Sequence, residues 1–564
     1  MAARRCTACP SHHIHRRELD NHSRRRPRRY AWWWTTVYAG AGGLAALLWL
    51  LLRSGPKPSR LGYPCQQAAL GTAGAAFAAP IAALAGPVLR GLGRALRKSQ
   101  GRVAAGVLAG VAVALLAFAS GERDIDTASL RPSSTYRPDV YLVNKARGIT
   151  TGRYGGVDDL ITLMGVSGFK WHRSEQIDLT SGPDGLIGIS DVVILKINGQ
   201  WERRGGTNTD VLRGVIRRIV EHPDGFVGEV IVADNEQFAS GALNWGENNA
   251  QDYSQSAQVV VDDFAAEGWK VATSLWKTIR EISVQEYSSG DMTSGYVVDP
   301  VRNPQTQINV SYPKFQTAFG TYVSYKYGIW YPTSQTYAPE RLVVINMPVL
   351  KTHGQYAITA SVKNHMGLVT TGRIDTNAHS AVASGGMGTV LAEVRMPDLT
   401  ILDCIWILAR PRAGPSAPYE SASRRDQLLA GTDPIALDMW AAKHILIPQI
   451  IANGYSYDAY HWTQDPDNPD SVFRRYIDAS MSELLAAGIA VTNDVSAVRL
   501  HVWVGDLDRD GDVDAGDFIQ VASCGLGPGV EVGGTGCEDT DFDDDGDADL
   551  GDFAAFQQMF TGAR

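Results

Sequence analysis

The segment LVVINMPVLKTHGQYAITASVKNHMG, residues 342–367, joins an apolar run to a stretch rich in basic and amide side chains. Its first four residues are β-branched or Leu, as expected for a buried strand. Lys351, His353, Lys363 and Asn364 follow within a short distance. A strand that leads such residues into a turn and a helix is typical of a site for an anion or a metal ion. A solvated surface loop is the alternative interpretation.

Strand and helix patterns alternate on both sides of this segment. We predict strands at 140–143, 191–195, 229–233, 342–345 and 399–402, and helices at 156–164, 209–222, 257–267 and 434–444. Apolar runs without alternation are typical of strands that are buried on both faces. The pattern therefore predicts an α/β domain with a mostly parallel sheet over residues 139–450, followed by a connecting region at 451–504.

Polar residues follow several of these strands. In open α/β sheets, ligands bind beyond the carboxyl ends of the strands, so these side chains are expected to meet at one edge. Lysines can hold a carboxylate or phosphate, and asparagines can orient it. The candidates for ligand binding or catalysis are Lys196, Asn198, Lys351, His353, Lys363 and Asn364, with Asn346, Asp234 and Asp403 beside them.

Histidines in the same region suggest two further roles. His353 and His379 are candidates for a general acid or base near neutral pH. Alternatively, these two and His365, together with aspartates, could bind a divalent metal ion. Between about 270 and 340 the alternation gives way to a Tyr-, Ser- and Thr-rich stretch. We interpret it as an insertion of short strands, which forms a lid, a carbohydrate-facing surface or simply an aromatic core.

Four ordered motifs of the α/β domain resemble a known family. They are Leu195–Asn198, Asn346–His353, Ser361–Asn364 with Gly367, and Leu429–Asp438. Together they are similar to the domain-of-unknown-function family numbered 362, over about residues 140–450. The resemblance implies an uncharacterised activity. Some members carry a ferredoxin-like iron–sulfur module, but this chain lacks the clustered cysteines that such a module needs, so no iron–sulfur cluster is expected.

The N-terminal part has the features of a membrane anchor. Residues 1–29 are arginine-rich and predict a basic cytoplasmic tail; Cys6 and Cys9 with nearby histidines offer zinc binding as an alternative. Residues 30–120 contain three charge-free apolar runs, at 30–52, 66–89 and 103–120, and thus up to three transmembrane helices. A cleaved signal peptide is the competing interpretation. A linker at 121–138 follows.

Basic residues between the runs indicate the orientation. The tail and the loop at 90–102 carry the most arginine and lysine, so both are expected on the cytoplasmic side. Three spans then leave the remainder of the chain outside. We therefore expect a multi-pass protein of the cell membrane whose bulk is extracytoplasmic.

The C-terminal segment, residues 505–564, contains two copies of a calcium-loop pattern. Each twelve-residue loop has carboxylates at positions 1, 3, 5, 9 and 12, glycine at position 6 and a residue at position 7 that offers its carbonyl. A short helix follows each loop. The predicted ligands are Asp506, Asp508, Asp510, Asp512, Asp514 and Asp517 in the first loop, and Asp541, Asp543, Asp545, Asp547, Asp549 and Asp552 in the second.

Two loop–helix units that end in Asp resemble a dockerin-type module, a small helical relative of the EF-hand. The resemblance implies two Ca²⁺ ions and a cohesin-like or other cell-surface partner, often in polysaccharide-associated systems. A calcium-stabilised cap without a partner is the alternative. Cys524 and Cys537 lie between the repeats and could form a disulfide if this part is extracellular.

Two functional hypotheses follow. In the first, a membrane-anchored, outward-facing α/β domain binds or processes an anionic small molecule or glycan, and the calcium module makes a surface or protein contact. In the second, the chain is a non-enzymatic surface binding or adhesion protein. Hydrophobic content of 44% and charged-residue content of 20% are globular values, and we expect no nucleic-acid partner.

Overall fold

The computed structural model describes residues 136–144, 146, 148–150, 153–237, 249–370, 377–503, 507, 513–533, 535, 537–542 and 546–559. The basic tail and the three predicted membrane spans lie outside these residues. So do six of the predicted calcium ligands, which are Asp506, Asp508, Asp510, Asp512, Asp543 and Asp545.

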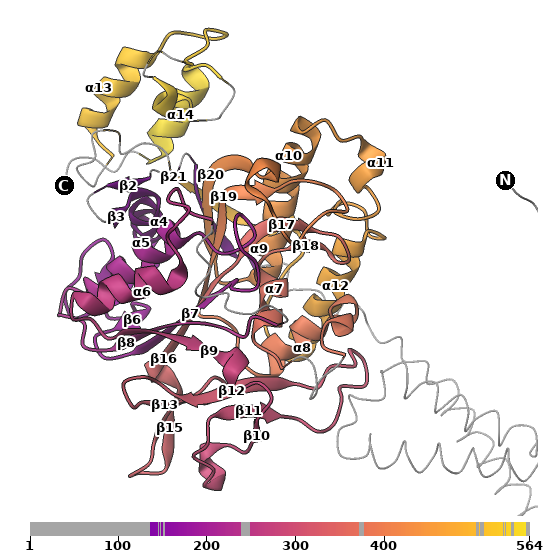
Figure 1. The fold of residues 1–564 in the computed structure, drawn as a ribbon. Helices are drawn as coiled ribbons and strands as arrows, with labels where there is room; N and C mark the ends of the chain where they lie inside the picture. Colours follow the sequence, from indigo (N-terminus) through magenta and orange to yellow (C-terminus); the bar gives the residue numbers. More distant parts are fainter. Residues whose placement is uncertain are drawn as a thin grey trace, which may run out of the picture. The chain divides into compact units, whose positions relative to one another are not determined.

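A large mixed sheet organises the α/β domain (Figure 1). Its strands lie in the order β21-β1-β20-β19-β16-β7-β8-β9. They are β1 (Asp139–Val143), β7 (Val192–Ile197), β8 (Glu229–Asp234), β9 (Val271–Leu275), β16 (Leu342–Met347), β19 (Leu399–Leu408), β20 (Ser423–Gly431) and β21 (Arg499–Trp503). β20 is antiparallel to both of its neighbours, and the other pairs along this order are parallel.

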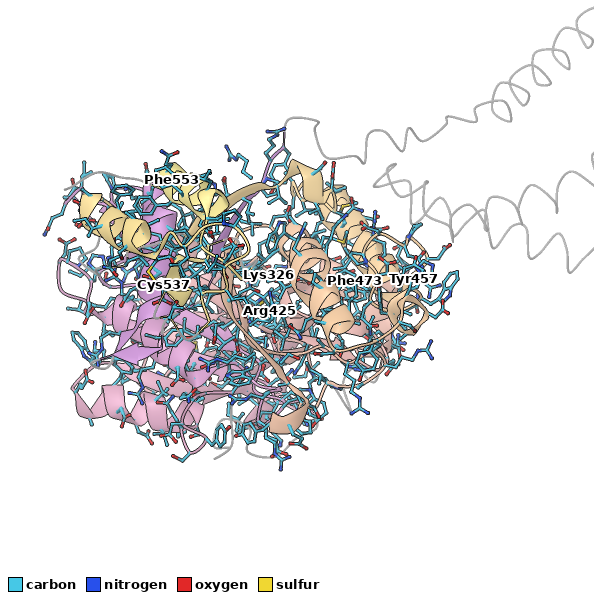
Figure 2. All side chains as sticks on the ribbon, turned by 90° about the horizontal axis from the view of Figure 1, so that it is seen from above. Lys326, Arg425, Tyr457, Phe473, Cys537 and Phe553 are labelled. Carbon is cyan, nitrogen blue, oxygen red and sulfur yellow. A yellow bond between two sulfur atoms is a disulfide. The ribbon has the colours of Figure 1, made fainter. Side chains whose placement is uncertain are left out.

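Both faces of the sheet are covered, which explains the continuous apolar runs. On β7, Val193 and Leu195 pack into one core, whereas Val192 and Ile194 pack into the other. The first core contains side chains of α4 (Gly155–Val166), α5 (Thr209–Val220) and α6 (Ala257–Ala266). The second contains those of α8 (Gly386–Glu393), α9 (Pro434–Ala441) and α12 (Val472–Ala486), whose Phe473 is labelled in Figure 2.

The aromatic insertion forms a separate six-stranded sheet. Its strands are β10 (Ser283–Val284), β11 (Gly295–Val298), β12 (Ser311–Gln316), β13 (Tyr322–Ser324), β14 (Gly328–Tyr331) and β15 (Thr336–Ala338), in sequence order. Tyr325 and Trp330 are buried in it, whereas Tyr327 and Tyr331 are exposed. Buried rings of the insertion, Tyr325 among them, join the second core of the main sheet, and a few rings are left at the surface.

Shorter elements connect these layers. They are β2 (Ile149–Thr150), β3 (Arg153–Tyr154), β4 (His172–Arg173), β5 (Ser181–Gly182), β6 (Ile187–Gly188), η4 (Trp276–Thr278), η5 (Tyr287–Ser289), η6 (Pro339–Arg341), η7 (His365–Gly367), η8 (Ser380–Ser384), η9 (Tyr419–Ser421), α10 (Ile447–Ala452), α11 (Tyr457–Tyr460) and η11 (Val495–Ala497).

Three elements differ from the sequence-based expectation. The segment after β16 is not a simple turn but a hairpin of β17 (Val349–His353) and β18 (Ala357–Thr359), followed by the short helix α7 (Ser361–Asn364). β19 continues past Asp403, so this residue lies within a strand rather than at its end. The predicted connecting region contains α12 and β21, and β21 pairs in parallel with β1. Each difference extends the sheet by backbone pairing that apolar periodicity does not reveal.

One helical stretch among the described residues, Pro434–Ala452, is long and apolar enough to cross a membrane. It consists of α9, the π-helical turn η10 (Ala442–Leu446) and α10. Every residue of α9 is buried in the domain. Its burial is that of a core helix, and in the sequence it is distinct from the three spans predicted within residues 30–120.

The C-terminal part contains two helices, α13 (Ala515–Cys524) and α14 (Leu550–Met559), with the turn η12 (Glu538–Thr540) between them. A disulfide joins Cys524 to Cys537, the latter labelled with Phe553 in Figure 2. The rings of Phe518 and Phe553 lie 5.7 Å apart, measured between their centroids. The two repeats therefore pack their helices against each other.

Candidate functional site

Lys196 and Asp234 form a buried ion pair on the neighbouring parallel strands β7 and β8. Lys196 Nζ lies 2.8 Å from Asp234 Oδ2, and it also donates to the backbone oxygens of Ile197 and Asn364, at 2.8 and 2.7 Å. These three acceptors use all three donors of an ammonium group. Lys196 was a candidate ligand-binding residue, but in the structure it ties β7 to β8 and to α7. It has no donor left for a ligand.

Asn364 continues this structural network. Its Nδ2 donates to Asn346 Oδ1 at 2.8 Å, and Asn346 Nδ2 donates to the carbonyl of Ser361 at 3.2 Å. Both asparagines are buried. Gly367 is required beside them, because a Cβ there would overlap Asp234 Oδ2 and Lys196 Nζ. The amides therefore hold α7 against β16, which is a different role from orienting a ligand.

Lys351 and Lys363 are buried without a carboxylate in salt-bridge contact in the part of the chain that the structure describes. Lys351, on β17, donates to the carbonyl of Gly205 and lies 5.9 Å from the ring centroid of Trp201. Lys363, on α7, lies 5.4 Å from the ring centroid of Tyr356. Burial lowers the pKa of Lys363 to about 7, and burial together with the nearby Lys363 lowers the pKa of Lys351 well below its ordinary value.

Two histidines adjoin these lysines. The ring centroids of His353 and His379 are 6.1 Å apart, and Tyr356 contacts both rings. Burial, with the charges of the two lysines, lowers the pKa of His353 to about 2. Burial and Lys363 lower that of His379 to about 4. Both imidazoles are therefore neutral at neutral pH. We call Lys351, His353, Lys363 and His379 the basic cluster.

The hydrogen bonds of His353 define its tautomer. Its Nδ1 accepts from the backbone N–H groups of Gln355 and Tyr356, at 3.1 and 3.2 Å. A neutral imidazole that accepts at Nδ1 carries its proton on Nε2. His353 is therefore a hydrogen-bond donor at Nε2, and the predicted role as a general acid or base stays a prediction. The tight turn between β17 and β18 places these two backbone N–H groups beside His353 Nδ1.

The remaining predicted residues lie elsewhere in the network. Asn198 is buried after β7, and its backbone N–H donates to Thr207 Oγ1 at 2.7 Å. No contact recorded among the described residues joins it to the basic cluster. His365 donates from Nδ1 to the carbonyl of Ser361 at 3.1 Å, within its own helical turn. The suggested grouping of His353, His365 and His379 around a metal is not present among the described residues.

Asp403 belongs to a second buried centre, which sequence reasoning missed. Its carboxylate accepts from the backbone N–H groups of Asn208 and Ile405 and from Asn249 Nδ2, at 2.9–3.0 Å. Burial raises the pKa of Asp403 to about 7. The nearby Arg204 guanidinium stacks over three aromatic rings, of Trp406, Tyr419 and Tyr253, at 4.1–5.2 Å. No local sequence pattern predicts this group of Asp403, Arg204 and three aromatic rings, because its members come from four separate segments of the chain.

The two calcium-loop repeats have equivalent hydrogen bonds. Asp517 accepts from the backbone N–H groups of Leu507 and Asp514, and Asp552 accepts from those of Phe542 and Asp549. In each loop the carboxylate at position 12 thus accepts hydrogen bonds from the backbone at positions 2 and 9. Asp547, Asp549 and Asp552 place one carboxylate oxygen each within 4.8 Å of one another, which suits a metal ion.

Comparison with known proteins supports the family resemblance of the central domain and no other part of the chain. Residues 336–443 match the model of the family described as Domain of unknown function (DUF362). This match spans β16 to β20, α7 and α9, and so includes the whole basic cluster. No curated protein and no solved structure matched the chain.

Proposed function

We propose that the α/β domain binds an anionic small molecule, or the anionic group of a glycan, at the basic cluster. The observation that carries the proposal is the pair Lys351 and Lys363. Two buried lysines lie close enough for their charges to interact, and neither is in ion-pair contact with a carboxylate among the described residues. The charge of Asp234 acts on Lys351 from farther away, and Asp234 is already paired with Lys196. Buried charges in proteins are normally paired.

An anion would supply the missing partner. A carboxylate or phosphate beside both lysines would favour their charged forms, and its oxygens could accept from the Nε2–H of His353. Because ion pairing is strong in a site shielded from water, even a small anion would be held tightly. Without a ligand, burial lowers the pKa of both lysines, and we interpret this as the resting state of a binding site.

Isothermal titration of the purified chain with inorganic phosphate, and separately with a uronic acid, tests this proposal. We expect Lys351→Met to weaken binding by about 30-fold or more, since removing one member of a buried charge pair costs about 2–5 kcal/mol. Lys270→Met, at an exposed lysine, serves as the matched control and should leave the affinity unchanged. Equal affinities for all three proteins would place any anion site elsewhere.

We further propose that the chain is anchored by its N-terminal apolar runs, with the α/β domain and the C-terminal module outside the cell. The support is the apolar runs themselves, the distribution of basic residues and the disulfide between Cys524 and Cys537. Disulfides persist outside the reducing cytosol. Protease treatment of intact cells should remove residues 121–564 and spare the basic tail; digestion of the tail alone would reverse the orientation.

The C-terminal module is proposed to bind two Ca²⁺ ions and to contact a cohesin-like or other surface protein. Supporting this are the two twelve-residue patterns and the matching hydrogen bonds of Asp517 and Asp552. Bound Ca²⁺ would neutralise carboxylates that otherwise repel one another. A non-enzymatic binding or adhesion protein, with this module as a calcium-stabilised cap, uses the same features and remains the second candidate.

Calcium should stabilise the module measurably. In about 10 mM Ca²⁺ the unfolding of residues 505–564, followed in the full chain by hydrogen exchange, should cost about 1–3 kcal/mol more than in a chelator. Asp549→Asn should remove most of this gain, because it removes one carboxylate from the second loop. Asp539→Asn, at an exposed aspartate outside the loops, should retain it. A calcium-independent exchange rate in the unmodified chain would refute the proposal.

A further inference from the structure

Lys363 differs from the other buried lysines that the structure describes. Lys196 donates to three acceptors, Lys314 to the carbonyls of Gln285 and Asp291, and Lys351 to the carbonyl of Gly205. The described residues provide no hydrogen-bond acceptor for Lys363 Nζ, which lies over the face of Tyr356, 5.4 Å from its ring centroid. Its amine group is therefore not committed to holding the fold together.

We infer that Lys363 Nζ is a nucleophile that forms an imine with a small carbonyl compound carrying a carboxylate, such as a 2-oxo acid. The inference rests on the proposed function, because the carboxylate would be held by Lys351. In this step the amine nitrogen attacks the carbonyl carbon and forms a C–N bond. The amine loses two hydrogens, and the carbonyl oxygen leaves with them as water, so no oxidant or reductant is needed.

The surroundings of Lys363 suit this chemistry. Only a neutral amine has a lone pair for attack, and burial lowers the pKa of Lys363 to about 7. About half of the groups are then neutral at pH 7, against about one in three thousand for a lysine with the ordinary pKa. The substrate's carboxylate would favour the charged form of the neighbouring Lys351, whose pKa burial otherwise lowers, and would pair with it. His353, protonated at Nε2, can donate a hydrogen bond to the carbonyl oxygen as negative charge develops there.

Reductive trapping tests the inference on the full chain. Incubation with glyoxylate and cyanoborohydride reduces any imine to a stable carboxymethyl-amine, which mass spectrometry locates after tryptic digestion. Since trypsin does not cut after an alkylated lysine, modified Lys363 appears in the fragment 352–373. We expect labelling there on the order of a hundredfold faster than at a lysine of ordinary pKa. Acetaldehyde, which has no charge, should lose most of this preference.

Two variants separate the possible outcomes. Lys363→Arg keeps a cation but cannot form an imine, so labelling of this position should vanish while glyoxylate binding persists. Lys270→Arg, at the exposed control lysine, should leave the rate at Lys363 unchanged. If unmodified protein binds glyoxylate and Lys363 is not labelled, the imine inference is refuted and the anion site stands. If glyoxylate and phosphate both fail to bind, the proposed function itself fails.

Discussion

Replacing Lys196 by methionine is expected to lower the free energy of unfolding by about 3–5 kcal/mol. The substitution leaves Asp234 as a buried carboxylate that has lost its cation, in a position 1% exposed. It also removes donors from the carbonyls of Ile197 and Asn364, both of which face the same ammonium. Urea unfolding of the purified chain, followed by tryptophan fluorescence, measures the change.

A second substitution tests the reason for this loss. In Lys196→Met with Asp234→Asn, no uncompensated charge remains, so at least about half of the lost stability should return. Asn can still accept the hydrogen bond that Asp234 Oδ1 receives from the backbone N–H of Glu236. If the single and the double variants are equally unstable, the cost comes from packing or from the two carbonyls and not from the unpaired carboxylate.

Replacing Lys363 by methionine is expected to have the opposite effect and to raise the free energy of unfolding at pH 7. Lys363 is buried without a carboxylate partner among the described residues, so folding must desolvate an ammonium group or release its proton. Methionine has a similar length, fits the same contact with Tyr356 and carries no charge. We expect a gain of several kcal/mol at most, about 4–5, because the pKa falls from 10.5 to about 7.

The pH dependence gives the sign of this effect. Below pH 7 both the folded and the unfolded chain bind the proton of Lys363, and above pH 10.5 neither does. Between these values the unfolded chain binds one proton more, so stability rises with pH by about 1.4 kcal/mol per unit. The stability lost as pH falls from 10.5 to 7 is the desolvation cost of this lysine. Lys363→Met should lack this slope.

Stability curves of the two proteins between pH 7 and 10 provide the measurement. The difference between them isolates Lys363 from other groups that titrate in the same range, including Lys351. Lys270→Met, at an exposed lysine, should follow the unmodified protein throughout. A destabilised Lys363→Met variant with an unchanged slope would show that this lysine is structural. It would then resemble Lys196, and the anion site would lose its main support.

The sequence by itself determined the α/β class and predicted that several polar side chains gather at one edge of the sheet. Apolar runs such as Asp191–Leu195 and Leu342–Ile345 indicated strands buried on both faces, and the structure pairs β7 and β16 in parallel. The polar residues at their ends then had to meet at one sheet edge, since parallel strands end on the same side. Lys196, Asp234 and Asn364 do meet there. The sequence also suggested that Cys524 and Cys537, between the two repeats, could form a disulfide, and the structure joins them.

Only the tertiary structure decided what each of these residues does. Lys196 and Lys363 have the same chemistry and follow similar motifs, yet one has three acceptors and the other none among the described residues. Asp234, the carboxylate that pairs with Lys196 and not with Lys363, is 38 residues from Lys196 in the chain. The tautomer of His353 depends in the same way on two backbone N–H groups in a turn. The role of each side chain depends on contacts with residues that are distant in the sequence. The local sequence around a residue does not show which of these residues will contact it.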